Sequence, residues 1–171
     1  MTRPLASVSA VIAGCDGRTQ SKLVSDQENG ASRCTPLPNL ICVASSSRWS
    51  AAFEASSANT VRGFAVNRFA NNSDIAVWNF DNNIIEGNFL GTDPTGTANV
   101  GSLNSLHVSG ITGTAVGGTA PEARNLISGN TGPALALNNG VFDNFVEGNT
   151  FGLDVTDSIG LGNAGNDLLV M

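Results

Sequence analysis

The chain has 171 residues, a formal net charge of −6 and a single lysine, Lys22. This balance argues against nucleic acid or an anionic membrane surface as the main partner, because both attract basic proteins. The length suits one domain with a core of ordinary size, and no stretch reaches the ~20 apolar residues of a transmembrane helix. Frequent glycine and asparagine, which tolerate positive φ, predict a fold with many turns.

The composition changes along the chain. Residues 1–55 hold all three cysteines, with five basic and four acidic side chains, whereas residues 56–171 hold seventeen of the twenty glycines, with three basic and ten acidic side chains. This shift predicts a boundary near residues 55 to 58. We expect an N-terminal segment of unclear structure at 1–58 (a leader, a cap or a non-native start) and a repeat region at 59–171. Three cysteines cannot all pair within one chain, so no disulfide framework is predicted.

The first element in chain order is a candidate lipidation signal. Ile12-Ala13-Gly14-Cys15 resembles a bacterial lipobox, in which the cysteine becomes the lipidated first residue of the mature chain. The apolar run before it is short and is interrupted by Pro4, Ser7 and Ser9. The alternative is a coincidental match in a poorly ordered leader, which this interruption favours.

Four short strands are predicted where an apolar residue, a polar residue and glycine follow one another. They lie in "VRGFAV" (61–66), "IIEGNFL" (84–90), "LISGN" (126–130) and "FVEGNTF" (145–151). Alternation with period two indicates half-buried strands, and the glycine marks a bend. The alternation points Val61, Ile85, Ile127 and Val146 inward, and Arg62, Glu86, Ser128 and Glu147 outward.

Further short strands are predicted between these four, at residues 74–80, 105–111, 115–118, 134–139 and 167–170. All are separated by residues that favour turns. Residues 121–124 could form one short turn at most, and no helical pattern of ten or more residues occurs after residue 56. Short strands at even spacing suit a sandwich or a solenoid.

An internal repeat favours the solenoid. "NIIEGNFLGTDPTGTANVG" (83–101) returns 61 residues later as "NFVEGNTFGLDVTDSIGLG" (144–162). Stacked coils repeat the same strand-and-turn motif at the same position of each coil, whereas a sandwich fold does not require such a repeat. The glycine spacings predict four or five coils of roughly twenty to thirty residues. Structural positions of the repeat are Gly87, Asn88, Asp93, Gly129, Asn130, Gly148, Asn149 and Asp154; stacked Asn88, Asn130 and Asn149 are expected to hydrogen-bond from coil to coil.

Three phrases carry a family resemblance: "NNIIEGNFLGTDPTGTANVG", "VGGTAPEARNLISGN" and "VRGFAVNRF". They resemble the repeats of bacterial right-handed parallel β-helix proteins in the pectate-lyase-like superfamily, and within it a surface-protein branch. The resemblance implies an all-β right-handed parallel β-helix over about residues 59–170, in a secreted or cell-surface chain, and says little about activity. As partners we expect polysaccharide or other surface proteins. We also expect a fragment of a longer repeat protein, with uncapped ends whose strand edges pair with another chain.

Asp93 and Asp154 are the best-placed carboxylates, because each follows a Gly-x pair at the same point of the repeat. They could bind Ca²⁺, act as an acid/base pair, or cap their own backbone in an Asx-turn. Recurrence at one register favours the turn, since a catalytic residue need occur only once. Asp157 adds a carboxylate close to Asp154, so this pair is the candidate Ca²⁺ site; no other cofactor is expected.

Aromatic residues give the candidate glycan contacts. Trp78 and Phe80, together with Phe64, Phe69 and Phe89, could form a strip on which sugars stack. The alternative places them in the core or between coils, as is usual for aromatic side chains.

Two function classes remain. The first is a non-catalytic scaffold or adhesive module; the second is a fragment of a polysaccharide lyase or glycoside hydrolase. The only histidine, His107, lies in a segment (56–171) that holds no cysteine and no second histidine with which to complete a Cys-His pair or a zinc set. Glu86 and Glu147 recur but are expected to lie too far apart in the stack for glycoside cleavage. No catalytic residue is therefore assigned, and the first class is preferred.

Overall fold

A computed structural model describes residues 42–44, 51–54, 60–69, 73–78 and 81–171. The first sheet contains β1 (Cys42–Ala44), β4 (Phe64–Val66), β7 (Phe89–Leu90), β10 (Leu126–Ile127) and β13 (Thr150–Phe151). The second sheet contains β2 (Ala51–Glu54), β5 (Ser73–Trp78), β8 (Asn104–Ser109), β11 (Leu135–Asn138) and β14 (Leu168–Val170). The third sheet contains β3 (Thr60–Arg62), β6 (Ile84–Glu86), β9 (Ala115–Gly117) and β12 (Phe145–Glu147).

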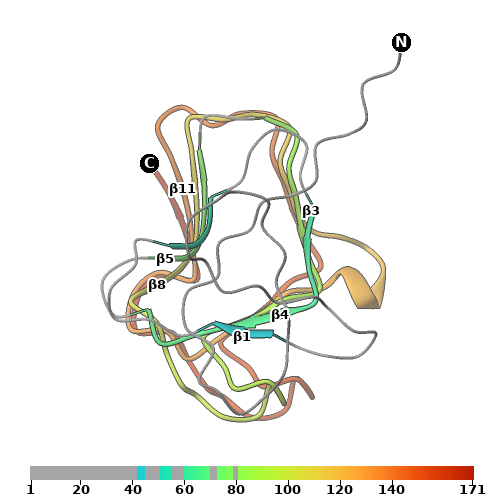
Figure 1. Cartoon of the computed structure of the whole chain (residues 1–171), viewed down its shortest axis with the longest axis vertical. Helices are drawn as coiled ribbons and strands as arrows, with labels where there is room; N and C mark the ends of the chain where they lie inside the picture. The colour runs from blue at the N-terminus through green and yellow to red at the C-terminus, as the bar shows by residue number, and fades with distance from the viewer. Residues whose placement is uncertain (1–41, 45–50, 55–59, 70–72, 79–80) are drawn as a thin grey trace, which may run out of the picture.

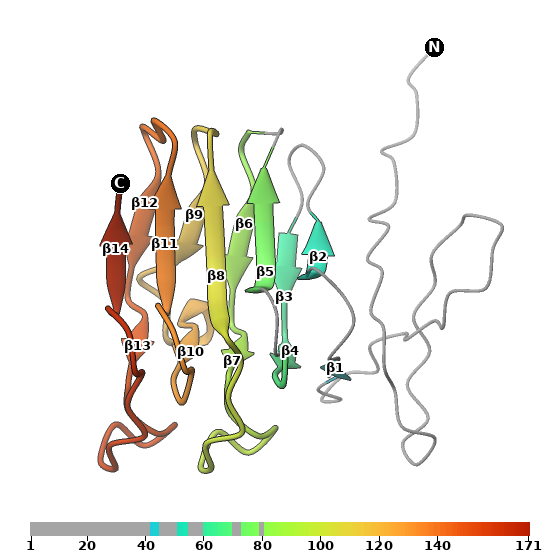
Figure 2. The same ribbon diagram turned by 90° about the vertical axis from the view of Figure 1, so that its left-hand side faces the viewer.

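The fold is all-β, and the strands within each sheet are parallel. Each strand pairs with the strand three places along the chain, so β5 pairs with β8 and β8 with β11. The three sheets form three walls in the view of Figure 1, and Figure 2 shows the strands of one wall side by side. The arrangement is consistent with a parallel β-helix in which one coil contributes one strand to each wall. The predicted strands and the short turn at η1 (Pro121–Ala123) are confirmed.

Aliphatic side chains stack in columns between the walls. One column contains Val61, Ile85 and Val116, which the strand register places opposite one another. All three are at most 2% exposed. Each such side chain removed from water contributes about 1.5–3 kcal/mol, so the columns supply the main stabilisation of the stack.

The register differs from the sequence prediction at one strand. Ile127 was expected beside Val61, Ile85 and Val146, but Val116 occupies that position. Ile127 pairs instead with Leu90 and Phe151 in the first sheet. As a result, Ser128 is buried rather than outward and Gly129 leaves the expected glycine column. The coil that carries η1 has a longer connection between β9 and β10. The triplets "VGG" (116–118) and "ISG" (127–129) are so similar that alignment by glycine selects the wrong one.

Asparagine side chains link the coils in two ladders. In the first, Asn88 Nδ2 donates to Asn125 Oδ1 at 3.0 Å, and Asn125 Nδ2 donates to Asn149 Oδ1 at 2.9 Å. In the second, Ser102 N donates to Asn130 Oδ1 at 3.2 Å, and Asn130 Nδ2 donates to Asn163 Oδ1 at 3.1 Å. Coil-to-coil bonding of asparagines is thus confirmed, but Asn130 belongs to a different ladder from Asn88 and Asn149.

The sheets begin before the boundary expected at residue 58. β1 pairs with β4 and β2 pairs with β5, so both strands extend the stack toward the N-terminus. The lipidation candidate Cys15 lies outside the described residues. Within the described ranges, none of the helical structure has the length and apolar character needed to cross a bilayer.

Candidate functional site

The two Asp-containing loops have matching hydrogen bonds. Asp93 Oδ1 accepts from Thr97 N at 3.0 Å and from Ala98 N at 2.9 Å. Asp154 Oδ1 accepts from the equivalent amides, Ser158 N at 2.9 Å and Ile159 N at 3.0 Å. These side chains cap their own loops, as the Asx-turn interpretation predicts.

Hydrogen bonding also sets the acidity of the two carboxyls. The Ile159 amide, with further donors from its loop, lowers the pKa of Asp154. At Asp93 partial burial acts to raise the pKa, but the Thr95 hydroxyl and the loop amides outweigh it and lower the pKa. Both carboxyls are therefore held as carboxylates by donors that stabilise the charged form.

Asp157 is tied to a different coil. Arg124 Nη1 contacts Asp157 Oδ2, and Arg124 Nη2 donates to Val155 O at 3.3 Å. The Arg124 hydrogen bond lowers the pKa of Asp157, and the Thr150 hydroxyl adds to this effect. The candidate Ca²⁺ ligands Asp154 and Asp157 thus already accept hydrogen bonds, and within the described ranges no group of three or more metal-ligating side chains occurs. The Ca²⁺ site stays a prediction.

An Asp154→Ala variant separates the capping role from the metal role. We expect a lower Tm at pH 7, because the loop amides lose their acceptor. A carboxyl with a lowered folded-state pKa contributes stability above its unfolded pKa of about 3.9 and loses it as the pH falls through the folded value. The Tm difference from wild type should therefore shrink in acid.

Thermal melts with Ca²⁺ and with chelator complete this test. Capping alone predicts melts that do not depend on Ca²⁺. A Ca²⁺-dependent rise in Tm that both Asp154→Ala and Asp157→Asn abolish would establish the metal site instead. Asp81→Asn, at an exposed carboxyl outside both loops, is the control for loss of one negative charge.

The recurring glutamates lie on one column of the third sheet. Arg62 Nη1 and Glu86 Oε1 are 3.1 Å apart, an exposed pair of the kind worth at most about 1 kcal/mol. Glu147 lies on β12, and β9 separates it from β6. Two strand spacings amount to roughly 9.6 Å, so the structure does not bring the two carboxylates face to face across a cleft.

The outer face of the second sheet carries His107 and Trp78. Asn138 Nδ2 lies 2.8 Å from His107 Nε2, and because an amide nitrogen only donates, Nε2 acts as the acceptor. Burial lowers the pKa of His107, which favours the neutral ring. Trp78 is half-buried at the end of β5, in register with Ser109. Phe80 lies outside the described residues. Glycan contact by Trp78 and Phe80 stays a prediction.

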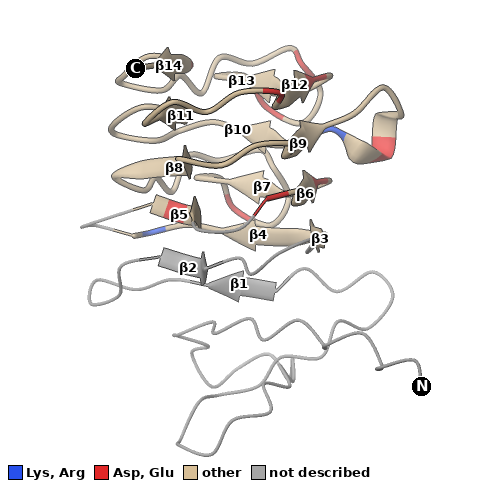
Figure 3. Cartoon of the chain, turned by 90° about the horizontal axis from the view of Figure 1, so that it is seen from above, with Lys and Arg blue, Asp and Glu red and all other residues tan. Residues whose placement is uncertain are grey.

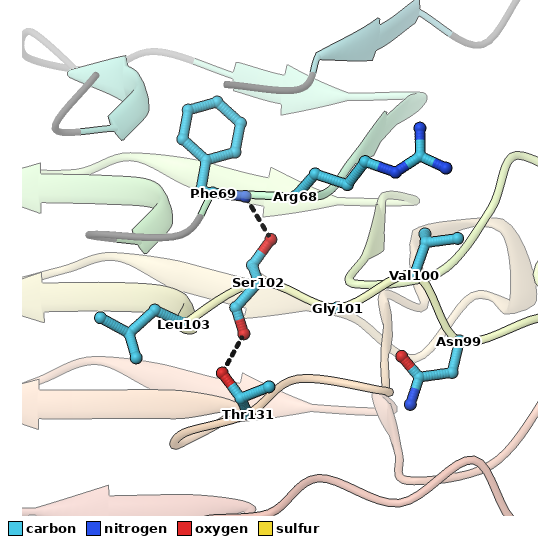
Figure 4. Close-up of a pocket in the computed structure, with 8 residues that line it drawn as sticks. All are labelled: Arg68, Phe69, Asn99, Val100, Gly101, Ser102, Leu103 and Thr131. Atoms are coloured by element: carbon cyan, nitrogen blue, oxygen red, sulfur yellow. Dashed lines mark hydrogen bonds between the residues drawn. The ribbon is translucent and has the colours of Figure 1, made fainter. Parts of the chain in front are cut away.

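An open groove lies at the corner between the first and second sheets. Its volume is about 750 Å³, and it is lined by Arg68, Phe69, Asn99, Val100, Gly101, Ser102, Leu103 and Thr131. Ser102 holds the corner together, because its hydroxyl accepts from Phe69 N at 3.2 Å and its carbonyl accepts from Thr131 Oγ1 at 3.1 Å. In Figure 4 the side chains of Arg68, Val100 and Asn99 lie on one side of this corner, and Leu103 lies on the other.

A buried carboxyl supports the groove from beneath. The Ser102 hydroxyl donates to Asp74 Oδ1, and Asp74 is 0% exposed. Burial raises the pKa of Asp74 well above its usual value, against the opposing effect of the Ser102 and Ser105 hydroxyls. Asp74 therefore favours its neutral form and links β5 to the groove wall.

No protein-family model, curated protein or solved structure matches the chain. The acidic residues of the described part of the chain are spread over several coils of the stack (Figure 3).

Sequence reasoning missed the groove and the central rung of the first ladder. Arg68 stood inside "VRGFAVNRF" and Asn125 inside "ARNLISGN", and both were read as parts of repeated phrases. Alignment of the coils by strand register, rather than by glycine alone, would have placed Asn125 beside Asn88 and Arg68 in a column of glycines.

Proposed function

We propose that the chain is a right-handed parallel β-helix of the pectate-lyase-like kind that acts as a non-catalytic secreted or cell-surface module. Two lines support the architecture: the pairing of each strand with the third strand after it, and the resemblance of the three repeated phrases. Right-handedness follows from the general rule that parallel strands in one sheet are joined by right-handed crossovers. In this proposal the sheets and loops are a rigid surface that contacts glycans or other surface proteins.

The main support for the non-catalytic proposal is that several carboxylates already form hydrogen bonds or ion pairs within the fold. Asp93 and Asp154 accept bonds within their own loops, Asp157 pairs with Arg124, and Glu86 pairs with Arg62. The groove is lined by a guanidinium, an amide, hydroxyls and apolar side chains. Such groups bind and orient a ligand, whereas acid/base chemistry needs a titratable pair placed on it.

Exposed apolar side chains support the proposed contact with other proteins. Phe145 on β12 is 65% exposed and Val170 on β14 is 64% exposed. Apolar surface of this kind favours association with another chain.

The experiment is a glycan array probed with the full chain, together with lyase and hydrolase assays with and without Ca²⁺. We expect binding to a subset of glycans and no turnover. Turnover of any polysaccharide would overturn the proposal in favour of the alternative, a fragment of a polysaccharide lyase or glycoside hydrolase. Sedimentation velocity at increasing concentration, on the same preparation, reports whether the chain self-associates.

A further inference from the structure

Arg68 occupies a position that is glycine in the following coils. The next residues, Phe69, Ser102, Asn130 and Asn163, bond in succession: Phe69 N to Ser102 Oγ, Ser102 N to Asn130 Oδ1, and Asn130 N to Asn163 Oδ1 at 3.1 Å. The residues before them are Arg68, Gly101, Gly129 and Gly162, with φ of 65°, 54°, 79° and 66°. Arg68 is therefore the one member of this four-residue column that carries a side chain.

The backbone does not favour an arginine at this position. Positive φ crowds a Cβ atom against the backbone, so glycine adopts it most readily, followed by asparagine and aspartate. The other described non-glycine residues with positive φ are Asn82, Asn139, Asp143 and Asp157, all of the tolerant types. A strained residue of another type points to a role for its side chain.

The Arg68 side chain has no acidic partner within the described ranges. Arg62 pairs with Glu86 and Arg124 pairs with Asp157, but no ion pair or hydrogen bond joins the exposed Arg68 guanidinium to another of the described residues. It lines the groove on the same side of the corner as Val100 and Asn99 (Figure 4). A cation left unpaired at an open groove, in a chain of net charge −6, is available to an anionic ligand.

We infer that the groove binds a sugar that carries a carboxylate, and that Arg68 is the residue that recognises the acid group. The inference rests on the proposed glycan-contacting function and specifies its ligand. A guanidinium matches a carboxylate with two parallel hydrogen bonds. Asn99 and Thr131 offer an amide and a hydroxyl for sugar hydroxyls, and Val100 and Leu103 offer apolar surface for the ring.

Two features favour a sugar with a single acid group over other anions. The groove lies at a corner between sheets, so it lacks the row of free backbone groups with which a sheet edge holds an extended acidic peptide. The net charge of −6 disfavours a polyanion through long-range repulsion. A short glycan that ends in one acidic residue avoids both problems.

The test is an amide NMR titration of the full ¹⁵N-labelled chain. The probes are N-acetylneuraminate and glucuronate, with N-acetylglucosamine and glucose as neutral sugars, and acetate and a glutamate-containing peptide as carboxylates without a sugar. We expect saturable shifts at Gly101, Ser102 and Thr131 with the acidic sugars, and at least tenfold weaker binding of every other probe, since one hydrogen bond to a charged group is worth about that much. Equal response to acetate or to the peptide would overturn the inference.

Arg68→Gly restores the column and removes the guanidinium. We expect at least a tenfold loss of acidic-sugar binding, with a Tm that is unchanged or higher. Arg62→Ala removes an arginine of the same charge from the third sheet and should leave the titration unaltered. Unchanged binding in Arg68→Gly would overturn the role of Arg68 while leaving the proposed function intact. Binding of neutral sugars but not of acidic sugars would overturn the preference for an acid group, and would also leave the proposed function intact. Failure of every glycan to bind the wild-type chain would count against the proposed function itself.

Discussion

Replacement of Asn125 by alanine is expected to destabilise the fold by about 2–6 kcal/mol, because it leaves two or more buried polar groups without partners at about 1–3 kcal/mol each. Asn125 is 0% exposed. Its Nδ2 donates to Ile85 O at 2.8 Å and to Asn149 Oδ1, and its Oδ1 accepts from Asn88 N at 3.0 Å and from Asn88 Nδ2. The free energy of unfolding, measured by denaturant titration, checks the prediction.

Two further alanine variants show whether the effect comes from the ladder. Asn149→Ala removes an outer rung, where Asn149 is half-buried, so its cost should be smaller than that of Asn125→Ala. Asn166→Ala changes an exposed asparagine and should fall within about 0.5 kcal/mol of wild type. Equal effects of Asn125→Ala and Asn166→Ala would show that the ladder contributes nothing to stability.

The sequence predicts the strands well because the alternation of apolar and polar residues is itself a physical requirement. Val61 and Ile85 are buried where the alternation places them, and the strand at Ala115–Gly117 lies within its predicted range. The same rule fails to align the coils, because an apolar-polar-glycine triplet suits more than one wall. Ile127 satisfies the triplet and still belongs to the first sheet.

The recurring Asp residues could be interpreted from the sequence, whereas the groove could not. Asp93 and Asp154 bond within five residues of themselves, so local spacing contains the information. The groove brings together Arg68, Asn99 and Thr131, which lie far apart in the chain. Their proximity depends on the number of residues in each coil, and the insertion at η1 alters that number.

The common feature of these cases is that function in a repeat fold shows as a departure from the repeat. Glycine recurs at Gly101, Gly129 and Gly162 because the corner requires positive φ. The backbone conformation accounts for this recurrence, so the recurrence does not indicate a ligand. Arg68 breaks the pattern at a cost in backbone strain. A residue that the fold does not need is therefore the better indicator of a ligand.

Replacement of Gly91 by alanine is expected to cost about 2–5 kcal/mol. Gly91 has a φ of +89°, and a Cβ atom there would overlap Ser128 O and the side-chain amide of Asn130. Strain at positive φ accounts for roughly 1–2 kcal/mol, and displacement of Asn130 from its ladder adds about 1–3 kcal/mol. The preceding coil also holds this residue, since Gly91 N donates to Val66 O at 2.8 Å. Denaturant titration gives the free energy of unfolding.

Gly63→Ala is the matched control, because it imposes the same kind of backbone strain without an overlap. Gly63 has a φ of +76°, and no atom lies within 4 Å of the position that its Cβ would take. Its expected cost is therefore the strain alone, roughly 1–2 kcal/mol. The difference between the two variants measures how closely the coils pack against each other at the ladder. Equal costs would mean that the stack relaxes around an added methyl group, and the rigid surface on which the proposed function depends would then be lost.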